Sequence, residues 1–240
     1  MVNLSEFNKK SLGKLFDYSV LPKYVQEKDI RLGCKKAIEY NCAAFYSSTT
    51  FWTPIIKEEL TGTDILIGSA IDFPFGASTS KIKAFETEYA VKIGCDVVDL
   101  TINVGALKDK KYDILRKELK DFKGAAGSAL TKAILEVCFL NDDEIKIGCE
   151  LIREAKIDYV KTSSGQFEGP SMEQFLLIRN TLKNSKVKLK VAGVKFPRPQ
   201  NAYAFLMAGA DLIGTRAAPE IINAIDQMRE IGLIPECKNK

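Results

Sequence analysis

The chain alternates short apolar segments with amphipathic, charge-rich segments along almost its whole length, and this alternation constrains the fold more than any other feature. Eight apolar segments are strand candidates that recur at spacings of roughly 23–35 residues, which is the repeat of a (β/α)8 barrel. They are residues 15–21, 42–48, 65–71, 97–103, 129–137, the start of 158–165, 188–193 and 211–216. Helices are predicted over residues 4–14, 26–40, 51–60, 80–93, 112–122, 142–155, 171–182, 201–208 and 219–231. Mostly apolar strands that end in polar loops indicate a parallel sheet covered on both faces.

An open, doubly wound α/β sheet is the rival arrangement, because it shows the same alternation of strands and helices. That fold commonly carries a G-x-G-x-x-G motif after its first strand. No such motif follows residues 15–21. The sequence therefore favours a single-domain (β/α)8 (TIM) barrel over residues 1–240, opened by a short N-terminal helix.

Four charged residues interrupt strands that are otherwise apolar, namely Asp99, Lys132, Lys161 and Lys190. Side chains alternate between the two faces of a strand, so each of the four lies on the face opposite to its immediate apolar neighbours. One such lysine could be a paired structural charge or lie on the solvent face. Four that converge are hard to explain structurally, because buried ion pairs rarely add net stability over apolar replacements. We therefore expect an active site at the carboxyl ends of the strands.

These residue types favour chemistry at a lysine amine. The chain contains no histidine, which excludes histidine-based triads and histidine-held zinc sites. A free lysine amine titrates near 10.4, so it is almost wholly protonated at neutral pH and cannot attack a carbonyl carbon. Burial and a neighbouring cation both lower that pKa. A second lysine beside the first can therefore create a nucleophile, and Asp99 can hold or shuttle the proton.

Composition narrows the remaining classes of function. The net charge is only +4 and no basic cluster is interleaved with aromatic residues, so nucleic-acid binding is not expected. No apolar run of 18 residues and no charged-then-apolar leader occurs, so neither a membrane span nor a signal peptide is expected. The six cysteines include no C-x-x-C pair, which favours buried thiols and a cytoplasmic location over disulfides or a zinc site.

Several ordered motifs resemble those of the deoxyribose-phosphate aldolase family. Residues 160–165, V-K-T-S-S-G, are similar to the family signature V-K-T-S-T-G. Four further segments resemble family motifs in the same order along the chain, at residues 16–21, 71–77, 94–107 and 208–215. The resemblance covers nearly the whole chain.

The resemblance implies a class I aldolase, which works through a lysine Schiff base and needs no metal or other cofactor. Its substrates would be a sugar phosphate and acetaldehyde: 2-deoxy-D-ribose 5-phosphate would be cleaved reversibly to D-glyceraldehyde 3-phosphate and acetaldehyde. Lys161 would form the Schiff base, Lys190 would lower its pKa, and Asp99 would act as acid and base. The supporting residues would be Lys132, Ser164 and Asp17. A homodimer is possible.

The region that matches the family's phosphate grip departs from the family pattern. The binding residues carried over by position are Gly165, Gly193, Lys195, Gly214, Thr215 and Arg216. After the second lysine the family has K-x-A/S-G-G-I/V-R, whereas residues 190–196 read K-V-A-G-V-K-F, so the second glycine has become Val194 or has been deleted. Arg216 stands where the family commonly has a hydroxyl, and it could bind phosphate bidentately or select a carboxylate.

These departures leave two alternatives open. The first is a Schiff-base aldolase of the same family that acts on a non-phosphorylated or carboxylated sugar, which Val194, Phe196 and Arg216 motivate. The second is a catalytically silent barrel that serves as a binding or scaffold protein. The presence of Lys161, Lys190 and Asp99 argues against this second alternative.

Overall fold

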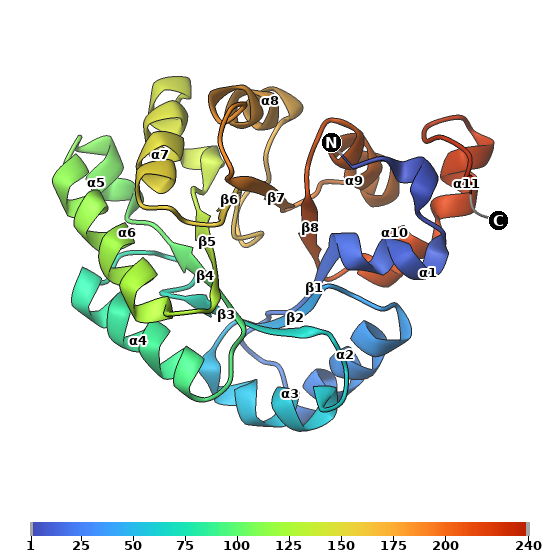
Figure 1. Cartoon of the computed structure of the whole chain (residues 1–240), viewed down its shortest axis with the longest axis horizontal. Helices are drawn as coiled ribbons and strands as arrows, with labels where there is room; N and C mark the ends of the chain where they lie inside the picture. The colour runs from blue at the N-terminus through green and yellow to red at the C-terminus, as the bar shows by residue number, and fades with distance from the viewer. Residues whose placement is uncertain (1, 239–240) are drawn as a thin grey trace.

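Eight parallel strands close into a barrel in the order in which they occur along the chain (Figure 1). The computed structural model describes residues 2–238. The strands are β1 (Phe16–Val20), β2 (Ala44–Ser47), β3 (Leu66–Ile71), β4 (Val97–Thr101), β5 (Leu130–Ile134), β6 (Tyr159–Lys161), β7 (Lys188–Ala192) and β8 (Leu212–Thr215). The barrel closes where β8 pairs with β1, with Asp17 opposite Gly214. The predicted (β/α)8 barrel is thus confirmed.

Helices surround the barrel and bury its outer face (Figure 1). Those that connect or follow the strands are α2 (Glu27–Glu39), α3 (Thr53–Leu60), α4 (Ser80–Lys92), α5 (Val104–Lys108), α6 (Tyr112–Ala126), α7 (Asp142–Glu154), α8 (Met172–Thr181), α9 (Arg198–Met207), α10 (Ala218–Asn223) and α11 (Ile225–Glu230). α7 shows why such segments are helical: the Asn141 side chain caps its first turn, which is acidic, and Ile145, Cys149 and Ile152 form its buried stripe.

The N-terminal helix predicted over residues 4–14 is in fact three short segments, so its predicted extent is wrong. They are the 3-10 turns Leu4–Glu6 and Gly13–Leu15 on either side of α1 (Lys9–Leu12). The side chain of Asn8 accepts hydrogen bonds from the amides of Lys10 and Ser11 and so begins a new helix. Gly13 lies so close to the carbonyl oxygen of Tyr40 that a Cβ atom would stand 1.8 Å from it. This backbone contact, which only glycine permits, fixes the path of the chain into β1.

The other differences are one additional helix and shifts in the ends of several elements. α5 was not predicted, and β4, β5 and β6 each end earlier than predicted because their last residues turn into the loops at the carboxyl end of the barrel. α9 begins at Arg198 rather than 201, since Pro199 lies in the first helical turn, where proline is tolerated. The last predicted helix divides into α10 and α11 at Ala224, whose ψ of 1° leaves the helical region.

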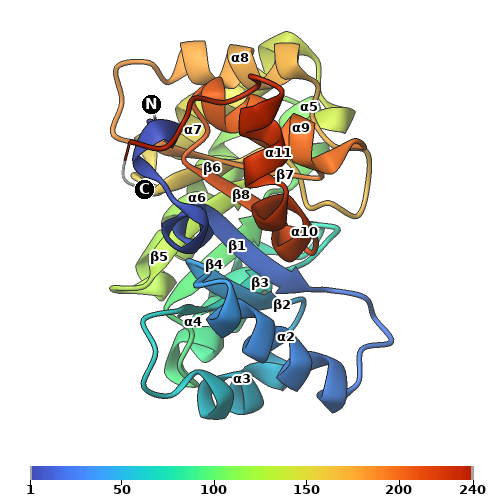
Figure 2. The same ribbon diagram turned by 90° about the vertical axis from the view of Figure 1, so that its right-hand side faces the viewer.

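Described segments near the two ends of the chain lie against each other on one side of the molecule (Figure 2). The amide of Lys238 donates a hydrogen bond to the carbonyl of Ser5 at 2.8 Å, and Nη2 of Arg229 donates to the carbonyl of Phe7 at 2.6 Å. The C-terminal segment, as far as residue 238, therefore lies on the segment that precedes β1. Between residues 2 and 238 no helix has the length and apolar character needed to cross a bilayer.

Candidate active site

The barrel interior brings five charged side chains together from five strands. Asp17 comes from β1, Asp99 from β4, Lys132 from β5, Lys161 from β6 and Lys190 from β7. The strand register aligns Asp99 with Lys132, and Lys161 with Lys190. All five are buried, with at most 6% of their surface exposed. The structure thus brings together the three lysines and both aspartates that the sequence singled out.

The two carboxylates bridge the three ammonium groups. Oδ2 of Asp99 accepts hydrogen bonds from Nζ of Lys161 at 2.9 Å and from Nζ of Lys190 at 2.8 Å. Oδ2 of Asp17 lies 2.7 Å from Nζ of Lys190 and 2.6 Å from Nζ of Lys132. Lys190 is therefore the central cation, since it contacts both aspartates, whereas each of the other lysines contacts only one.

This arrangement sets the protonation state of each lysine. Burial lowers the pKa of Lys161 to about 8, and the charge of Lys190 adds to this effect against the opposing attraction of Asp99. Burial acts on Lys190 in the same direction, but Asp17 and Asp99 together outweigh it and raise the pKa of Lys190 above its ordinary value. For Lys132 burial prevails and the pKa is lowered. With a pKa of about 8, roughly a tenth of Lys161 is the neutral amine at pH 7.

The aspartates remain ionised within this cluster. Burial alone would raise the pKa of Asp99, but the ammonium groups of Lys161 and Lys190 hold it well below its ordinary value. The pKa of Asp17 is likewise lowered, because Lys132 and Lys190 outweigh the effect of burial. Two negative charges thus face three amines, so one amine can lose its proton without leaving an unpaired charge.

Tyr46 belongs to this cluster, although the sequence did not single it out. It lies on β2 with 3% of its surface exposed, and its hydroxyl donates a hydrogen bond of 2.8 Å to Oδ1 of Asp99. Nζ of Lys190 lies 4.2 Å from the centre of its ring. The two-residue period of β2 could have predicted that Tyr46 faces the barrel interior, but it does not identify the partner of the hydroxyl.

Glu136 is a second buried group that the predicted site left out. It lies two residues beyond β5 in the left-handed backbone region, with φ of 55°. Its Oε1 accepts a hydrogen bond of 3.0 Å from the amide of Ser164, and its Oε2 has no hydrogen-bond partner within residues 2–238. Burial raises the pKa of Glu136, with Ser164 and Lys161 opposing the shift. Glu136 thus holds the backbone of the loop that follows the Schiff-base candidate.

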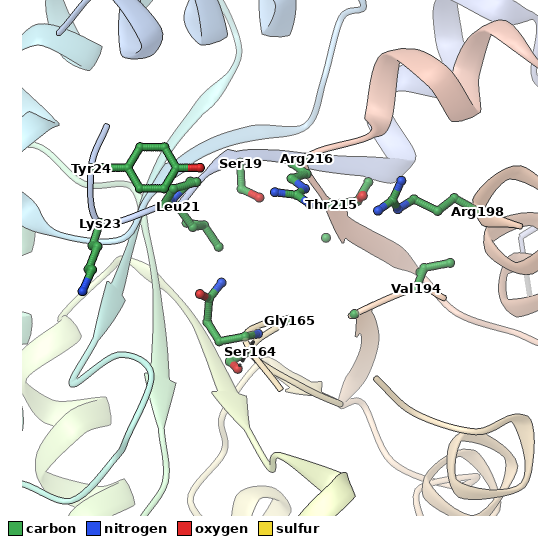
Figure 3. A pocket seen from close by; sticks show the side chains of 14 residues that line it. Ser19, Leu21, Lys23, Tyr24, Ser164, Gly165, Val194, Arg198, Thr215 and Arg216 are labelled. Carbon is green, nitrogen blue, oxygen red and sulfur yellow. Dashed lines mark hydrogen bonds between the residues drawn. The ribbon is translucent and has the colours of Figure 1, made fainter. Parts of the chain in front are cut away.

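Two cavities open above these side chains and share Ser19, Leu21, Ser164 and Gly214 in their walls. The inner cavity is about 20 Å³ and is lined by Lys161, Lys190 and Tyr46, among others. The outer one is about 470 Å³ and is formed by the loops at the carboxyl end of the barrel (Figure 3). A substrate that fills the outer cavity could therefore place one end near Nζ of Lys161.

Most of the residues that the sequence assigned to phosphate binding line the outer cavity. They are Gly165, Gly193, Gly214, Thr215 and Arg216. Gly165 and Gly193 have φ of 80° and 75°, a backbone conformation that favours glycine and can turn amides toward an anion. Lys195 is not part of the wall, and its Nζ instead pairs with Glu168 at 2.6 Å.

Two cations of the outer cavity escaped the sequence analysis, namely Arg198 and Lys23. In Figure 3, Arg198 and Arg216 lie on the β8 side of the cavity beside Thr215, and Lys23 lies across from them. The Arg198 guanidinium stacks on the exposed ring of Phe196, 3.8 Å from its centre. Its place depends on how the loop after β7 folds back, which no sequence period reveals.

A parallel eight-stranded barrel whose lysines and aspartates meet below a cavity at the carboxyl ends of its strands defines the class of lysine-dependent aldolases. Comparison with known proteins narrows this class. Deoxyribose-phosphate aldolase of Clostridium novyi (strain NT) is 40% identical over 214 residues, which cover 88% of this chain and 95% of that protein. The enzyme of the same name from Mycoplasma capricolum is 37% identical over 212 residues, covering 88% and 94% respectively. The chain belongs to the deoxyribose-phosphate aldolase family.

Solved structures agree with this assignment. The aldolase QR15 is 29% identical with a TM-score of 0.84, and the alignment covers 92% of this chain and 98% of that one. The tetrameric deoxyribose phosphate aldolase from Aeropyrum pernix, at 22% identity, has the same fold with a TM-score of 0.84 over 94% and 95% of the two chains. A scan against family models found no match.

Proposed function

We propose that this protein is a class I aldolase that reversibly cleaves 2-deoxy-D-ribose 5-phosphate to D-glyceraldehyde 3-phosphate and acetaldehyde. The observation that carries the proposal is the place of Lys161: its amine is buried beside Asp99, close to the charge of Lys190, and lines the inner cavity. Membership of the family supplies the substrate. The cytoplasmic location and the homodimer remain predictions from the sequence.

The neutral amine of Lys161 attacks the aldehyde carbon of the open-chain sugar to give a carbinolamine, which loses water to form an iminium ion. A base removes the proton of the C3 hydroxyl, the C2–C3 bond breaks, and its electron pair moves into the iminium ion. D-Glyceraldehyde 3-phosphate leaves, and an enamine stays on Lys161. Protonation at C2 and hydrolysis then release acetaldehyde and the free amine.

Each of the neighbouring groups has a role in these steps. Asp99, ionised and in contact with both catalytic lysines, is the group that exchanges protons with the carbinolamine. Lys190 stays protonated and keeps the pKa of Lys161 low. Lys132 neutralises Asp17, and Ser164 lines both cavities, where its hydroxyl can order the water that enters and leaves.

Trapping of the enzyme-bound intermediate tests this function. Wild-type protein is mixed with acetaldehyde and borohydride, and the modified peptides are identified by mass spectrometry. We expect an ethyl group on the peptide that contains Lys161, because reduction converts the imine to a stable secondary amine. The absence of any adduct, or its scatter over surface lysines, would support the silent barrel instead.

The outer cavity is proposed to hold the phosphate through the loops after β7 and β8, the usual phosphate site of such barrels. Arg216 is exposed and has no ion-pair partner within residues 2–238, so its guanidinium is available to an anion. We expect Arg216→Ala to raise KM for the phosphorylated sugar about tenfold, the effect of losing one charged hydrogen bond. Turnover of unphosphorylated 2-deoxyribose should not change.

A surface variant serves as the control for this prediction. Arg116→Ala removes another exposed guanidinium, on α6, where it pairs with Asp113 and Glu154, and should leave both KM values unchanged. If wild-type protein turns over a carboxylated sugar better than the phosphorylated one, Arg216 selects a carboxylate and the proposed substrate is wrong.

A further inference from the structure

The inner wall of the site contains an aromatic group to which the proposed mechanism gives no role. Resting on the proposed function, we propose that Tyr46 is a positioning residue for the reaction: its hydroxyl fixes the carboxylate of Asp99, and its ring holds the ammonium of Lys190. Both contacts come from one side chain on β2, on which no other member of the lysine–aspartate cluster lies.

The hydroxyl determines the orientation of the carboxylate. Asp99 is fully buried, and its Oδ2 is shared by Lys161 and Lys190. Oδ1 receives its hydrogen bond from Tyr46. Burial and the carboxylates of Asp99 and Asp17 raise the pKa of Tyr46 well above its ordinary value. The hydroxyl therefore stays protonated and acts as the donor of the hydrogen bond to Asp99. Without this bond the carboxylate could rotate and would lose the geometry in which one oxygen serves both lysines.

The ring acts on the cations. Nζ of Lys190 lies 4.2 Å from the ring centre and Nζ of Lys132 lies 5.5 Å from it, both within the range of a cation–π interaction. In a buried site this interaction favours the charged form of Lys190. Because that charge suppresses protonation of Lys161, the ring contributes indirectly to the supply of neutral amine.

The neighbouring strand is shaped to receive the ring. Gly68 on β3 is the register partner of Tyr46, and a Cβ atom on Gly68 would lie 2.5 Å from the ring. Any side chain at this position would push the ring out of place. The pair Tyr46–Gly68 therefore places a large aromatic group inside a barrel that already contains three buried lysine side chains.

The test uses Tyr46→Phe, which keeps the ring and removes only the hydroxyl. Asp99 then loses a hydrogen bond to its charged form, attracts the lysines more strongly and raises the pKa of Lys161. We expect kcat to fall about tenfold with KM nearly constant, since the lost bond acts on the chemical step. The acidic limb of the pH profile should move up by about half a unit.

Several charged or titratable groups contribute to that limb. Tyr46 is surrounded by Asp17, Asp99, Lys132, Lys190 and Tyr159, and Lys161 by Asp99, Lys132, Lys190 and Glu136. The acidic limb is therefore measured a second time, without turnover, as the pH dependence of reductive methylation of Lys161 by formaldehyde and cyanoborohydride, read by peptide mass spectrometry. This readout reports the amine itself and does not need aldolase activity.

Tyr203→Phe is the matched control. Its hydroxyl is also buried and donates a hydrogen bond of 2.9 Å to the carbonyl of Ile221, away from the lysine cluster. It should lower the melting temperature but leave the methylation midpoint of Lys161 unchanged. A second variant, Gly68→Ala, displaces the ring and should shift the midpoint as Tyr46→Phe does.

The outcomes separate the two proposals. If Tyr46→Phe shifts the methylation midpoint of Lys161 but the wild type forms no acetaldehyde adduct, the positioning role stands and the proposed reaction fails. If the wild type is active and Tyr46→Phe matches it in kcat and in both pH profiles, Tyr46 only fills space and the inference is overturned.

Discussion

Lys161→Ala should abolish formation of the covalent intermediate and lower kcat/KM for 2-deoxy-D-ribose 5-phosphate by at least about 10⁴-fold. Every step of the proposed reaction passes through a bond to its Nζ, and no other amine of the cluster both has a lowered pKa and lines the inner cavity. Lys190 contacts two carboxylates and remains charged, and Lys132 contacts Asp17 at the far side of the cluster. Turnover assays and borohydride trapping with acetaldehyde measure the two effects.

The Lys161→Ala protein should remain folded, which makes the loss interpretable. Asp99 keeps its contacts with Lys190 and Tyr46, so no buried charge is left without a partner. Lys188→Ala is the matched control, because Lys188 lies on β7 two residues before Lys190 but is exposed at the amino end of the strand. Thermal unfolding should be cooperative for both variants. Residual trapping in Lys161→Ala at wild-type levels would assign the Schiff base to another lysine.

Lys190→Met is expected to lower activity at pH 7 by about 10²-fold and to move the acidic limb of the rate profile to higher pH. Lys190 is one of the groups that lower the pKa of Lys161, and Asp99 is the group that raises it. Lys190→Met removes a positive charge that lowers the pKa of Lys161. It also leaves Lys161 as the only lysine of the cluster that contacts Asp99, which strengthens their ion pair. Both effects raise the pKa of Lys161 above about 8. Part of the activity should return as the pH rises, because the amine is again deprotonated.

Asp99→Asn should shift the acidic limb of the pH profile in the opposite direction, so it serves as the control for Lys190→Met. Loss of the carboxylate removes the group that raises the pKa of Lys161, so the acidic limb should move to lower pH even though kcat falls with the lost proton transfer. The pH dependence of kcat/KM in the two variants measures both shifts. A downward shift in Lys190→Met would mean that Lys190 does not act on Lys161 through its charge.

The barrel and the charged residues in its interior were predictable because they depend on local periods. The alternation of strands and helices along the chain favoured a (β/α)8 barrel, which the structure has. The two-residue period of a strand predicted that Asp99, Lys161 and Lys190 face the barrel interior, where all three are buried. Motif resemblance added Asp17 and Ser164, and the structure places both in the wall of the inner cavity. Element ends were less predictable: the split at Ala224 and the helix start at Arg198 depend on packing and turn geometry.

The type of fold and the set of charged residues that face its interior thus follow from local sequence patterns, since the side-chain period of a strand is a local property of the backbone. Which of these groups touch depends instead on contacts between distant parts of the chain. The bond from Lys132 to Asp17 spans 115 residues and that from Tyr46 to Asp99 spans 53, and no period relates positions so far apart. The same reason applies to Arg198 and Lys195, whose positions inside and outside the outer cavity are set by how the loop after β7 folds against its neighbours.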